Sequence, residues 1–253
     1  MVDQGTLARV NLFAVLRTLE GLPAHDDEAR KIANGKREVI QFTVGGVGKA
    51  RLAIGGGKIA FMPGGGGATI NLWFPDGAKL NAMFAGTGNP IPLKGLTKIG
   101  YLKGPFTALT DRLTHYLRAK PELLKDAKFR AANSELSLHV AFYALSEIAN
   151  ADPDGRLNAG RMTDGAILIA AKGGPALTIA VKDGRLETRN GDVEVPGKRA
   201  RMVFSSLDAA GQLIRGELSS YLAIGTGDVS LGGYTPIIDH MNKLLGLVPR
   251  YLS

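Results

Sequence analysis

An internal repeat is the feature that most constrains how this 253-residue chain can fold. Apolar residues near the N-terminus recur 129 positions later, where Leu12, Phe13, Leu16 and Leu19 correspond to Ala141, Phe142, Leu145 and Ile148. Later segments match at spacings of 127 to 130, among them Gly57-Lys58-Ile59 with Gly184-Arg185-Leu186, and Trp73-Phe74 with Val203-Phe204. An offset this constant indicates a duplicated domain of about 125 residues, a common domain size.

The repeat predicts two domains. We place the first, more divergent domain at residues 1–120 and the second at residues 134–253. Residues 121–133 are charged and helix-prone, and Pro121 suits the first turn of a helix. Because this segment has little of the Gly and Ser content of a flexible linker, we expect a helical connector.

Local patterns in the second copy predict its elements. Helical spacing of apolar residues indicates a helix over 134–149, ended by a turn at 152–155. Short β-branched runs predict strands at 165–171, 176–181, 185–189 and 199–204, which we expect to form an antiparallel meander. Ser205 and Asp208 resemble a capping box before a helix that ends at Gly216, and a further strand at 229–231 precedes a one-sided closing helix.

Composition and charge exclude several classes. The apolar content of 45% and charged content of 21% are typical of globular proteins. No apolar stretch approaches the length of a membrane span, and the start lacks the layout of a secretory signal, so we expect a cytoplasmic protein. The net charge of +8 has no long basic block, which argues against nucleic acid as a partner. Lys94, Lys98 and Lys103 form the basic cluster best suited to transient contact with an anionic membrane surface.

Motifs for catalysis, metals and cofactors are missing from the sequence. The Gly45-Gly46-Val47-Gly48-Lys49 stretch fails as a phosphate loop because Thr43 and Ala50 occupy required glycine and hydroxyl positions. The four histidines lack a second ligand at metal-binding spacing, and the chain has no cysteine. No serine stands in a nucleophile elbow. We therefore predict no catalytic residues, no metal and no cofactor.

An ordered series of landmarks carries a family resemblance. A strand ends at Ser206, an Asp208-containing helix leads to Gly216 and Leu218, and a strand from Gly227 to Gly233 precedes an amphipathic helix. Upstream, the apolar run 177–181 is followed by an Asp-Gly turn at 183–184. In this order the second copy resembles the sterol carrier protein family of non-specific lipid-transfer domains, and the chain looks like a tandem duplication of it.

The sequence departs from the family pattern at two basic positions. Where the family has Gly-Lys-Leu, this chain has Gly216-Glu217-Leu218, and a later Gly-Lys-Leu-Lys is Gly227-Asp228-Val229-Ser230. If those lysines help to hold a phosphate-bearing or CoA-linked lipid, this half loses that preference.

The resemblance implies an α+β fold with two tandem domains. Each would be a curved, mostly antiparallel sheet of about five strands, covered by helices, that encloses an apolar tunnel. It also implies a lipid-binding or transfer protein whose ligand is a fatty acid, an acyl-CoA or a sterol-like molecule. As ligand-binding residues we predict bulky apolar side chains of both copies: Trp73, Phe74, Met83, Phe84, Phe204, Ile214, Leu218, Tyr221, Leu222, Ile237, Met241 and Leu245.

Two other classes of function stay open from the sequence. A filled core would favour a non-catalytic interaction or dimerisation module, since similar domains occur as appendages of enzymes. An enzyme acting on lipid-like substrates would need a polar cluster inside the cavity, around His115, His240 or Asp239. The identity of the lipid, the number of halves that bind it and the oligomeric state are equally open.

Overall fold

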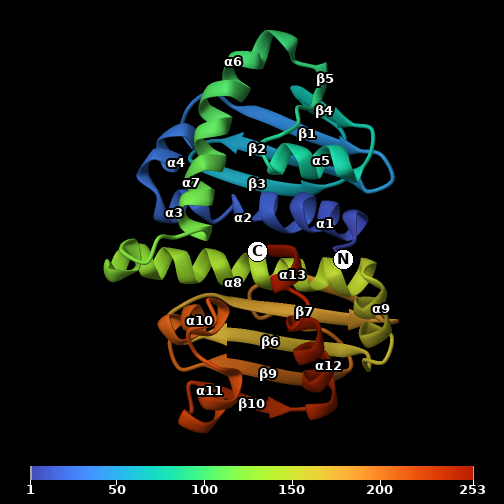
Figure 1. Ribbon diagram of the computed structural model, residues 1–253, viewed down its shortest axis with the longest axis vertical. Coiled ribbons are helices and arrows are strands. Elements are labelled where there is room, and N and C mark those ends of the chain that lie inside the picture. The colour runs from blue at the N-terminus through green and yellow to red at the C-terminus, as the bar shows by residue number, and fades with distance from the viewer. Residues whose placement is uncertain (1, 253) are drawn as a thin grey trace. The chain divides into compact units, whose positions relative to one another are not determined.

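The computed structural model describes residues 2–252, which divide into two compact units, residues 2–119 (unit 1) and residues 120–252 (unit 2). Each unit contains one five-stranded sheet and several helices (Figure 1), so the predicted α+β class is confirmed. The predicted connector, 121–133, contains a short 3-10 helix, Leu123–Lys125, and the start of a long helix.

Unit 1 begins with helices, continues through four strands and ends with helices around a fifth strand. Its elements are α1 (Gln4–Val10), η1 (Asn11–Val15), α2 (Leu16–Thr18), α3 (Leu22–His25), α4 (Asp27–Ala33), β1 (Glu38–Val44), β2 (Gly48–Gly55), β3 (Lys58–Pro63), β4 (Ile70–Phe74), α5 (Gly77–Phe84), β5 (Ile91–Lys94), η2 (Leu96–Lys98), α6 (Ile99–Tyr101), η3 (Leu102–Phe106) and α7 (Thr107–Leu117).

Unit 2 follows the same plan with fewer breaks in its helices. Its elements are η4 (Leu123–Lys125), α8 (Ala127–Ala151), α9 (Pro153–Ala159), β6 (Gly165–Ala171), β7 (Ala176–Lys182), β8 (Arg185–Asn190), β9 (Lys198–Phe204), α10 (Leu207–Ile214), α11 (Ser220–Thr226), β10 (Val229–Gly233), α12 (Thr235–Leu245) and α13 (Pro249–Leu252).

The two sheets have the same topology. Their strand orders are β3-β2-β1-β4-β5 and β8-β7-β6-β9-β10. In each sheet the first strand pairs in parallel with the fourth, and the other three pairs are antiparallel. Identical order and orientation are what a duplicated domain should give, and the prediction of mostly antiparallel five-stranded sheets is confirmed.

The predicted antiparallel meander is wrong at its fourth strand. β9 does not continue beside β8 but crosses back and pairs in parallel with β6. The physical reason lies in the strand sequences. β6, which reads GAILIAA, is apolar on both faces and gains most from a central position with a neighbour on each side. β8 carries Arg185, Glu187 and Arg189 on exposed positions and suits the edge of the sheet.

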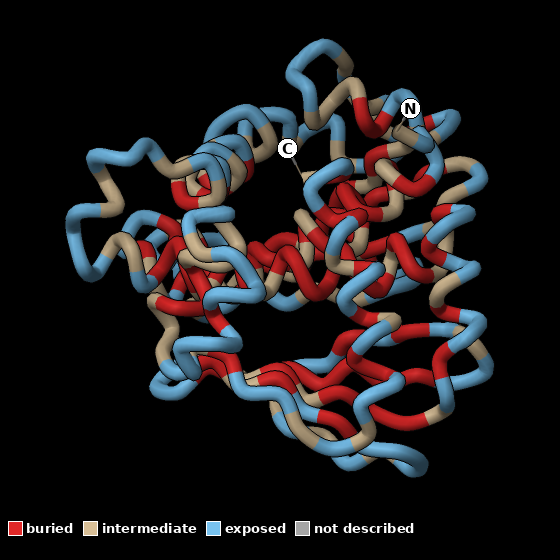
Figure 2. The backbone as a smooth tube through the Cα atoms, turned by 60° about the horizontal axis from the view of Figure 1, so that its bottom comes forward, coloured by how far each residue is buried: buried red, intermediate tan, exposed pale blue. Residues whose placement is uncertain are grey.

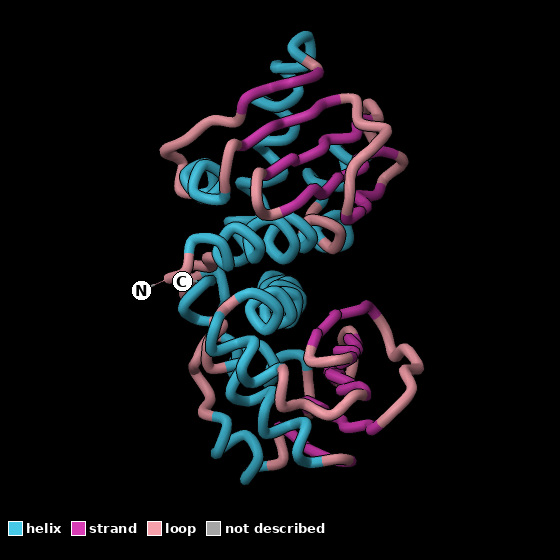
Figure 3. Tube along the Cα trace, turned by 90° about the vertical axis from the view of Figure 1, so that its right-hand side faces the viewer, coloured by secondary structure: helices cyan, strands magenta, loops and turns pink. Residues whose placement is uncertain are grey.

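The core of unit 2 lies between one face of its sheet and the covering helices (Figure 3). Ile167, Ile169 and Phe204 of the strands are fully buried, and α8, α10 and α12 pack against the sheet. Buried residues concentrate on these strands and helices (Figure 2). The closing helix α12 buries one apolar stripe, as its spacing predicts.

Three local predictions need correction. The helix predicted over 134–149 is α8, which is longer because Asp126 caps it at Phe129. The predicted stop at 152–155 does end the long helix, at Ala151, but residues from Pro153 on begin α9 rather than a turn, and Asp152 accepts a hydrogen bond from the backbone of Gly155. α10 is capped by Ser206 rather than by Ser205, which leaves Asp208 free to bond elsewhere.

Candidate functional site

A shallow and largely open pocket lies in unit 2 beside the N-terminal turns of α8 and one face of α10. We call it the polar pocket because most of its lining side chains are charged or polar, and its volume is about 430 Å³. Its lining residues come from two segments that are some 80 residues apart in sequence: Pro121, Leu124, Lys125, Arg130, Asp208, Gln212, Arg215 and Glu217.

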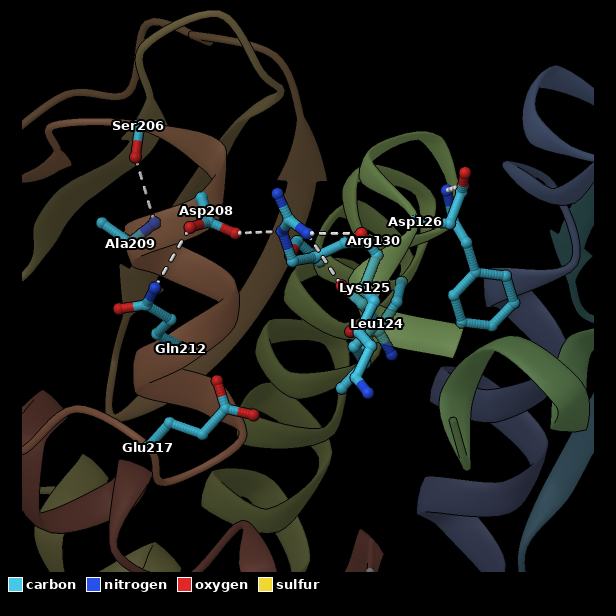
Figure 4. Close-up of polar contacts among 12 residues, drawn as sticks. Leu124, Lys125, Asp126, Arg130, Ser206, Asp208, Ala209, Gln212 and Glu217 are labelled. Carbon is cyan, nitrogen blue, oxygen red and sulfur yellow. Dashed lines mark hydrogen bonds and ion pairs between the residues drawn. The ribbon is translucent and has the colours of Figure 1, made fainter. Parts of the chain in front are cut away.

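Arg130 joins the two walls of this polar pocket (Figure 4). Its Nε donates to Asp208 Oδ1 at 2.9 Å, while one terminal nitrogen donates to the carbonyl of Leu124 at 2.8 Å. Gln212, one turn further along α10, donates to the other oxygen of Asp208 at 3.1 Å. The guanidinium thus fixes the short η4 turn against α10 and holds the pocket walls in place.

Arg215 and Glu217 also line the pocket. Arg215 Nε and one terminal nitrogen donate to the two carboxylate oxygens of Glu217 at 2.8 and 3.0 Å, a bidentate pair. The other terminal nitrogen donates to Asn133 Oδ1 of α8 at 2.9 Å. Hydrogen bonds from Arg215 lower the pKa of Glu217 below its ordinary value, so this carboxyl is ionised at neutral pH.

The pocket keeps one uncompensated positive charge. Asp208 and Glu217 pair with Arg130 and Arg215, whereas the exposed Lys125 ammonium makes no ion pair among the contacts of the described residues. Three cations against two carboxylates leave a formal charge of +1 on the lining residues. A single anionic group is the ligand that such a balance favours.

An exposed apolar surface adjoins the pocket in the chain. We define the α11 surface as Tyr221, Leu222 and Ile224 of α11 together with Leu231 of β10, because α11 packs on β10. Tyr221 is 91% exposed and Leu222 is 56% exposed, while the helix buries Ala223 instead. Only three residues separate Glu217 from Tyr221, at most about 14 Å of chain. Clustered exposed apolar side chains on a globular protein mark ligand or interaction sites.

The predicted ligand-binding residues of unit 2 fall into three groups. Phe204, Ile237 and Met241 are buried in the core and do not line the polar pocket. Ile214, Leu218 and Leu245 are half-buried. Tyr221 and Leu222 belong to the α11 surface. The structure therefore exposes Tyr221 and Leu222 on α11, buries or half-buries the others, and places none of the predicted residues in the lining of the polar pocket.

The predicted residues of unit 1 do not share one site. Trp73 and Phe74 are neighbours on β4, so their side chains point to opposite faces of the sheet. Phe74 is fully buried, whereas Trp73 is half-buried on the other face. Met83 and Phe84 are half-buried near the end of α5.

A second and larger pocket, of about 870 Å³, lies along β7 and β8 under residues 194–197. Its charged side chains are mostly paired with one another: Lys182 with Asp164 at 2.8 Å, and Arg189 with Glu187 at 2.6 Å. The charges of each pair neutralise one another, and side chains of both signs line the pocket. The lining therefore favours neither an anionic nor a cationic ligand.

The histidines and acids considered for catalysis do not meet in either pocket. Asp239 is exposed and pairs with Lys243 at 2.7 Å, one helical turn away. No group of three or more metal-ligating side chains occurs within residues 2–252. Among the helices of the same residues, none is long and apolar enough to cross a membrane.

Sequence reasoning missed the polar pocket. Arg215 and Glu217 are two residues apart, and Asp208 and Gln212 are one helical turn apart, so these pairs were visible as local patterns. Arg130 and Asp208 are separated by 78 positions. Only the packing of α10 on α8 brings them together, and no local pattern encodes that contact.

Comparison with known proteins gives little. No protein-family model matches the chain, and no curated protein sequence matches it. Among solved structures, a double mutant of the sec-alkyl sulfatase PisA1 aligns with 58% of this chain at 13% identity and a TM-score of 0.30. The inverting sec-alkylsulfatase Pisa1 from Pseudomonas sp. aligns with 60% of it at 14% identity and a TM-score of 0.29. The aligned part spans 28% of each sulfatase chain, and similarity this low carries no argument about function.

Proposed function

We propose that this protein is a non-catalytic carrier of amphipathic lipids, with a fatty acid as its preferred ligand. The observation that carries the proposal is that one stretch of unit 2 carries both residues of the polar pocket, whose lining has a formal charge of +1, and, a few residues later, the exposed side chains of the α11 surface. The sterol carrier resemblance of the same half points to the same class of ligand. A cytoplasmic location, expected from the sequence, belongs to this proposal.

The apolar part of the ligand supplies most of the binding free energy. Each methylene removed from water contributes about 0.8 kcal/mol. In this scheme the chain of the ligand lies on Tyr221, Leu222 and Ile224, which are exposed in the free protein. On an open surface each methylene loses only part of its contact with water, so more than about ten methylenes are needed to offset the cost of association and leave micromolar affinity.

The carboxylate of the ligand fits the polar pocket. Lys125 offers an ammonium with no competing carboxylate partner among the described contacts, and Arg130 keeps the pocket open by holding η4 against α10. An acyl-CoA fits less well, because Glu217 and Asp208 would face its several phosphate charges.

Displacement of a fluorescent fatty acid from the whole protein tests the apolar half of the site. We expect Leu222→Asp to weaken binding at least tenfold, because a charge replaces a contact of the acyl chain. The matched control is Leu157→Asp on α9, since Leu157 is 55% exposed against 56% for Leu222. Equal affinities of the two variants, with unchanged circular dichroism, would contradict the proposal.

Ligand charge tests the polar half. We expect Lys125→Glu to weaken binding of a fatty-acid anion about tenfold and to leave binding of an uncharged sterol unchanged, because only the anion meets the ammonium. Lys128→Glu is the control, since Lys128 is exposed in the same helical region but does not line the pocket.

The interaction-module alternative predicts a different result. If the α11 surface joins two copies of the chain, sedimentation will show a concentration-dependent dimer that Leu222→Asp dissociates, and no fatty acid will bind.

A further inference from the structure

A second exposed apolar segment lies in unit 1, around β5. Ile91, Leu93, Leu96 and Ile99 are 46%, 59%, 64% and 40% exposed. All four lie within nine consecutive positions, which include β5, η2 and the start of α6. We call residues 91–103 the β5 segment. Four large exposed apolar side chains this close together in the chain are more than the scattered single ones that a globular surface normally carries, and such groups often mark interaction sites.

A buried ion pair attaches the β5 segment to strand β1. Lys98 points inward and donates to Glu38 Oε2 at 2.5 Å, and the Glu38 side chain is 1% exposed. Thr69 donates to the same oxygen at 2.6 Å. Burial opposes ionisation of Glu38, but the hydrogen bonds from Lys98 and Thr69 outweigh it and lower its pKa. The ion pair directs the Lys98 side chain toward the sheet, while Leu96 and Ile99, which lie before and after Lys98 in the chain, stay exposed to solvent.

The charge of this region has one sign. From Gly77 to Thr110 the sequence contains four lysines and no acidic residue. Lys98 is neutralised by Glu38, whereas Lys94 bonds to the carbonyl of Ala68 at 2.6 Å and keeps its charge. Lys103 is exposed. Burial and the nearby Glu38 carboxylate raise the pKa of Tyr101 to about 12, so the phenol adds no negative charge.

The equivalent region of unit 2 differs in chemistry. β10 occupies the same place in its sheet as β5, and α11 beside it also exposes apolar side chains. Residues 218–227, however, contain no charged side chain. The two copies therefore expose apolar side chains at corresponding sheet edges, but only in unit 1 are they accompanied by lysines, Lys94 and Lys103, that have no carboxylate partner among the described contacts.

We propose that the β5 segment of unit 1 docks the protein onto the surface of an anionic lipid bilayer. The apolar side chains would enter the interface between headgroups and acyl chains, while Lys94 and Lys103 face the lipid phosphates. This docking surface is separate from the carrier site of unit 2 and does not depend on it. A lysine near an anionic leaflet strengthens binding about fivefold, so Lys103 together with Lys94, whose ammonium is bonded to a carbonyl but not to a carboxylate, predicts up to about a 25-fold preference for anionic over neutral membranes.

Vesicle co-sedimentation of the whole protein tests this surface. The probes are vesicles of pure phosphatidylcholine and vesicles with about one third phosphatidylglycerol. We expect binding to the anionic vesicles to be up to about 25-fold tighter than to the neutral ones. The double variant Leu93→Asp/Leu96→Asp should lose at least tenfold in affinity, and Lys94→Gln/Lys103→Gln should lose most of the preference for anionic vesicles. Leu157→Asp in unit 2 is the control and should bind as the unaltered protein does.

Three results would overturn the proposal. The first is no binding of the unaltered protein, or equal binding to both kinds of vesicle. The second is unchanged binding of the Leu93→Asp/Leu96→Asp variant. The third is a dimer in sedimentation that this variant dissociates, which would show that a second copy of the chain covers the segment. Fatty-acid displacement by the same variant separates the two proposals, because loss of docking should leave carrier binding in solution unchanged.

Discussion

At the scale of single residues, Asp26 shows how unit 1 uses buried charge. Its side chain is 2% exposed, caps α4 through the backbone of Ala29 at 2.8 Å, and accepts two hydrogen bonds from Arg112 of α7, one of them from Nε at 2.8 Å. Burial opposes its ionisation, but the bonds from Arg112 and Ala29 prevail, and the pKa of Asp26 lies below its ordinary value of 3.8.

Asp26→Asn should therefore destabilise the protein by about 3 kcal/mol, because it removes the helix cap charge and leaves the Arg112 guanidinium without its main partner. Urea unfolding at neutral pH measures the loss. Asp27→Asn is the control, since Asp27 is 83% exposed in its pair with Arg30. It should change the free energy of unfolding by less than about 0.5 kcal/mol. Equal losses of unfolding free energy in the two variants would contradict the role of Asp26 as a buried helix cap and ion-pair partner.

The pH dependence follows from the same lowered pKa values. A carboxyl whose pKa is lower in the folded state stabilises the fold above its unfolded pKa and loses that effect as pH falls through the folded value. Asp26 and Glu38 both behave in this way. We expect the free energy of unfolding to fall below about pH 4, and the fall to be shallower in Asp26→Asn. A variant with the same pH profile as the unaltered protein would argue against this.

At the scale of elements, the contact between α8 and α10 sets the geometry of the polar pocket. Gly211 of α10 lies so close to α8 that an added Cβ would come within 1.9 Å of Ser134 Oγ. The same face of α10 carries Asp208, Gln212 and Arg215. The short distance between α8 and α10 at Gly211 therefore sets the distance between Arg130 of α8 and Asp208 of α10.

Gly211→Ala should push α10 away from α8, destabilise unit 2 by about 2 kcal/mol and weaken fatty-acid binding. Gly225→Ala on α11 is the matched control, because nothing lies within 4 Å of its added Cβ and its backbone is helical. The control should be neutral or slightly more stable. Urea unfolding and ligand displacement together check the pair. If Gly211→Ala is as stable as Gly225→Ala, α10 does not pack so closely on α8 at Gly211 that a methyl group is excluded.

Sequence patterns predicted elements well where the signal is local. The bounds of β6 match the apolar run at 165–171, and Gly216 has the left-handed φ of 74° expected after a helix. Pairing of β9 with β6 and of Arg130 with Asp208 could not be predicted, because both depend on segments distant in sequence. The sequence also could not tell which of two neighbouring apolar residues on a strand faces the core, as with Trp73 and Phe74, whose side chains point to opposite faces of the sheet.

At the scale of the whole molecule, the repeat divides the chain into two units that each have a sheet and a core. Their apolar patches occupy corresponding sheet edges but differ in charge, which fits a division between lipid carriage in unit 2 and membrane docking in unit 1.

Residues 120–253 alone should fold and retain fatty-acid affinity within about threefold of the whole chain, because the pocket and the α11 surface both belong to this unit. Circular dichroism and ligand displacement measure the two properties. A folded fragment that binds no fatty acid would place the ligand elsewhere in the chain.

Native mass spectrometry of the gently purified whole protein, followed by solvent extraction, tests the central claim most directly. The carrier account predicts a complex with one lipid per chain, and a fatty acid in the extract. It also predicts that Leu222→Asp abolishes the complex and Leu157→Asp preserves it. A mass without ligand, together with no displacement of a fluorescent fatty acid, would contradict the account.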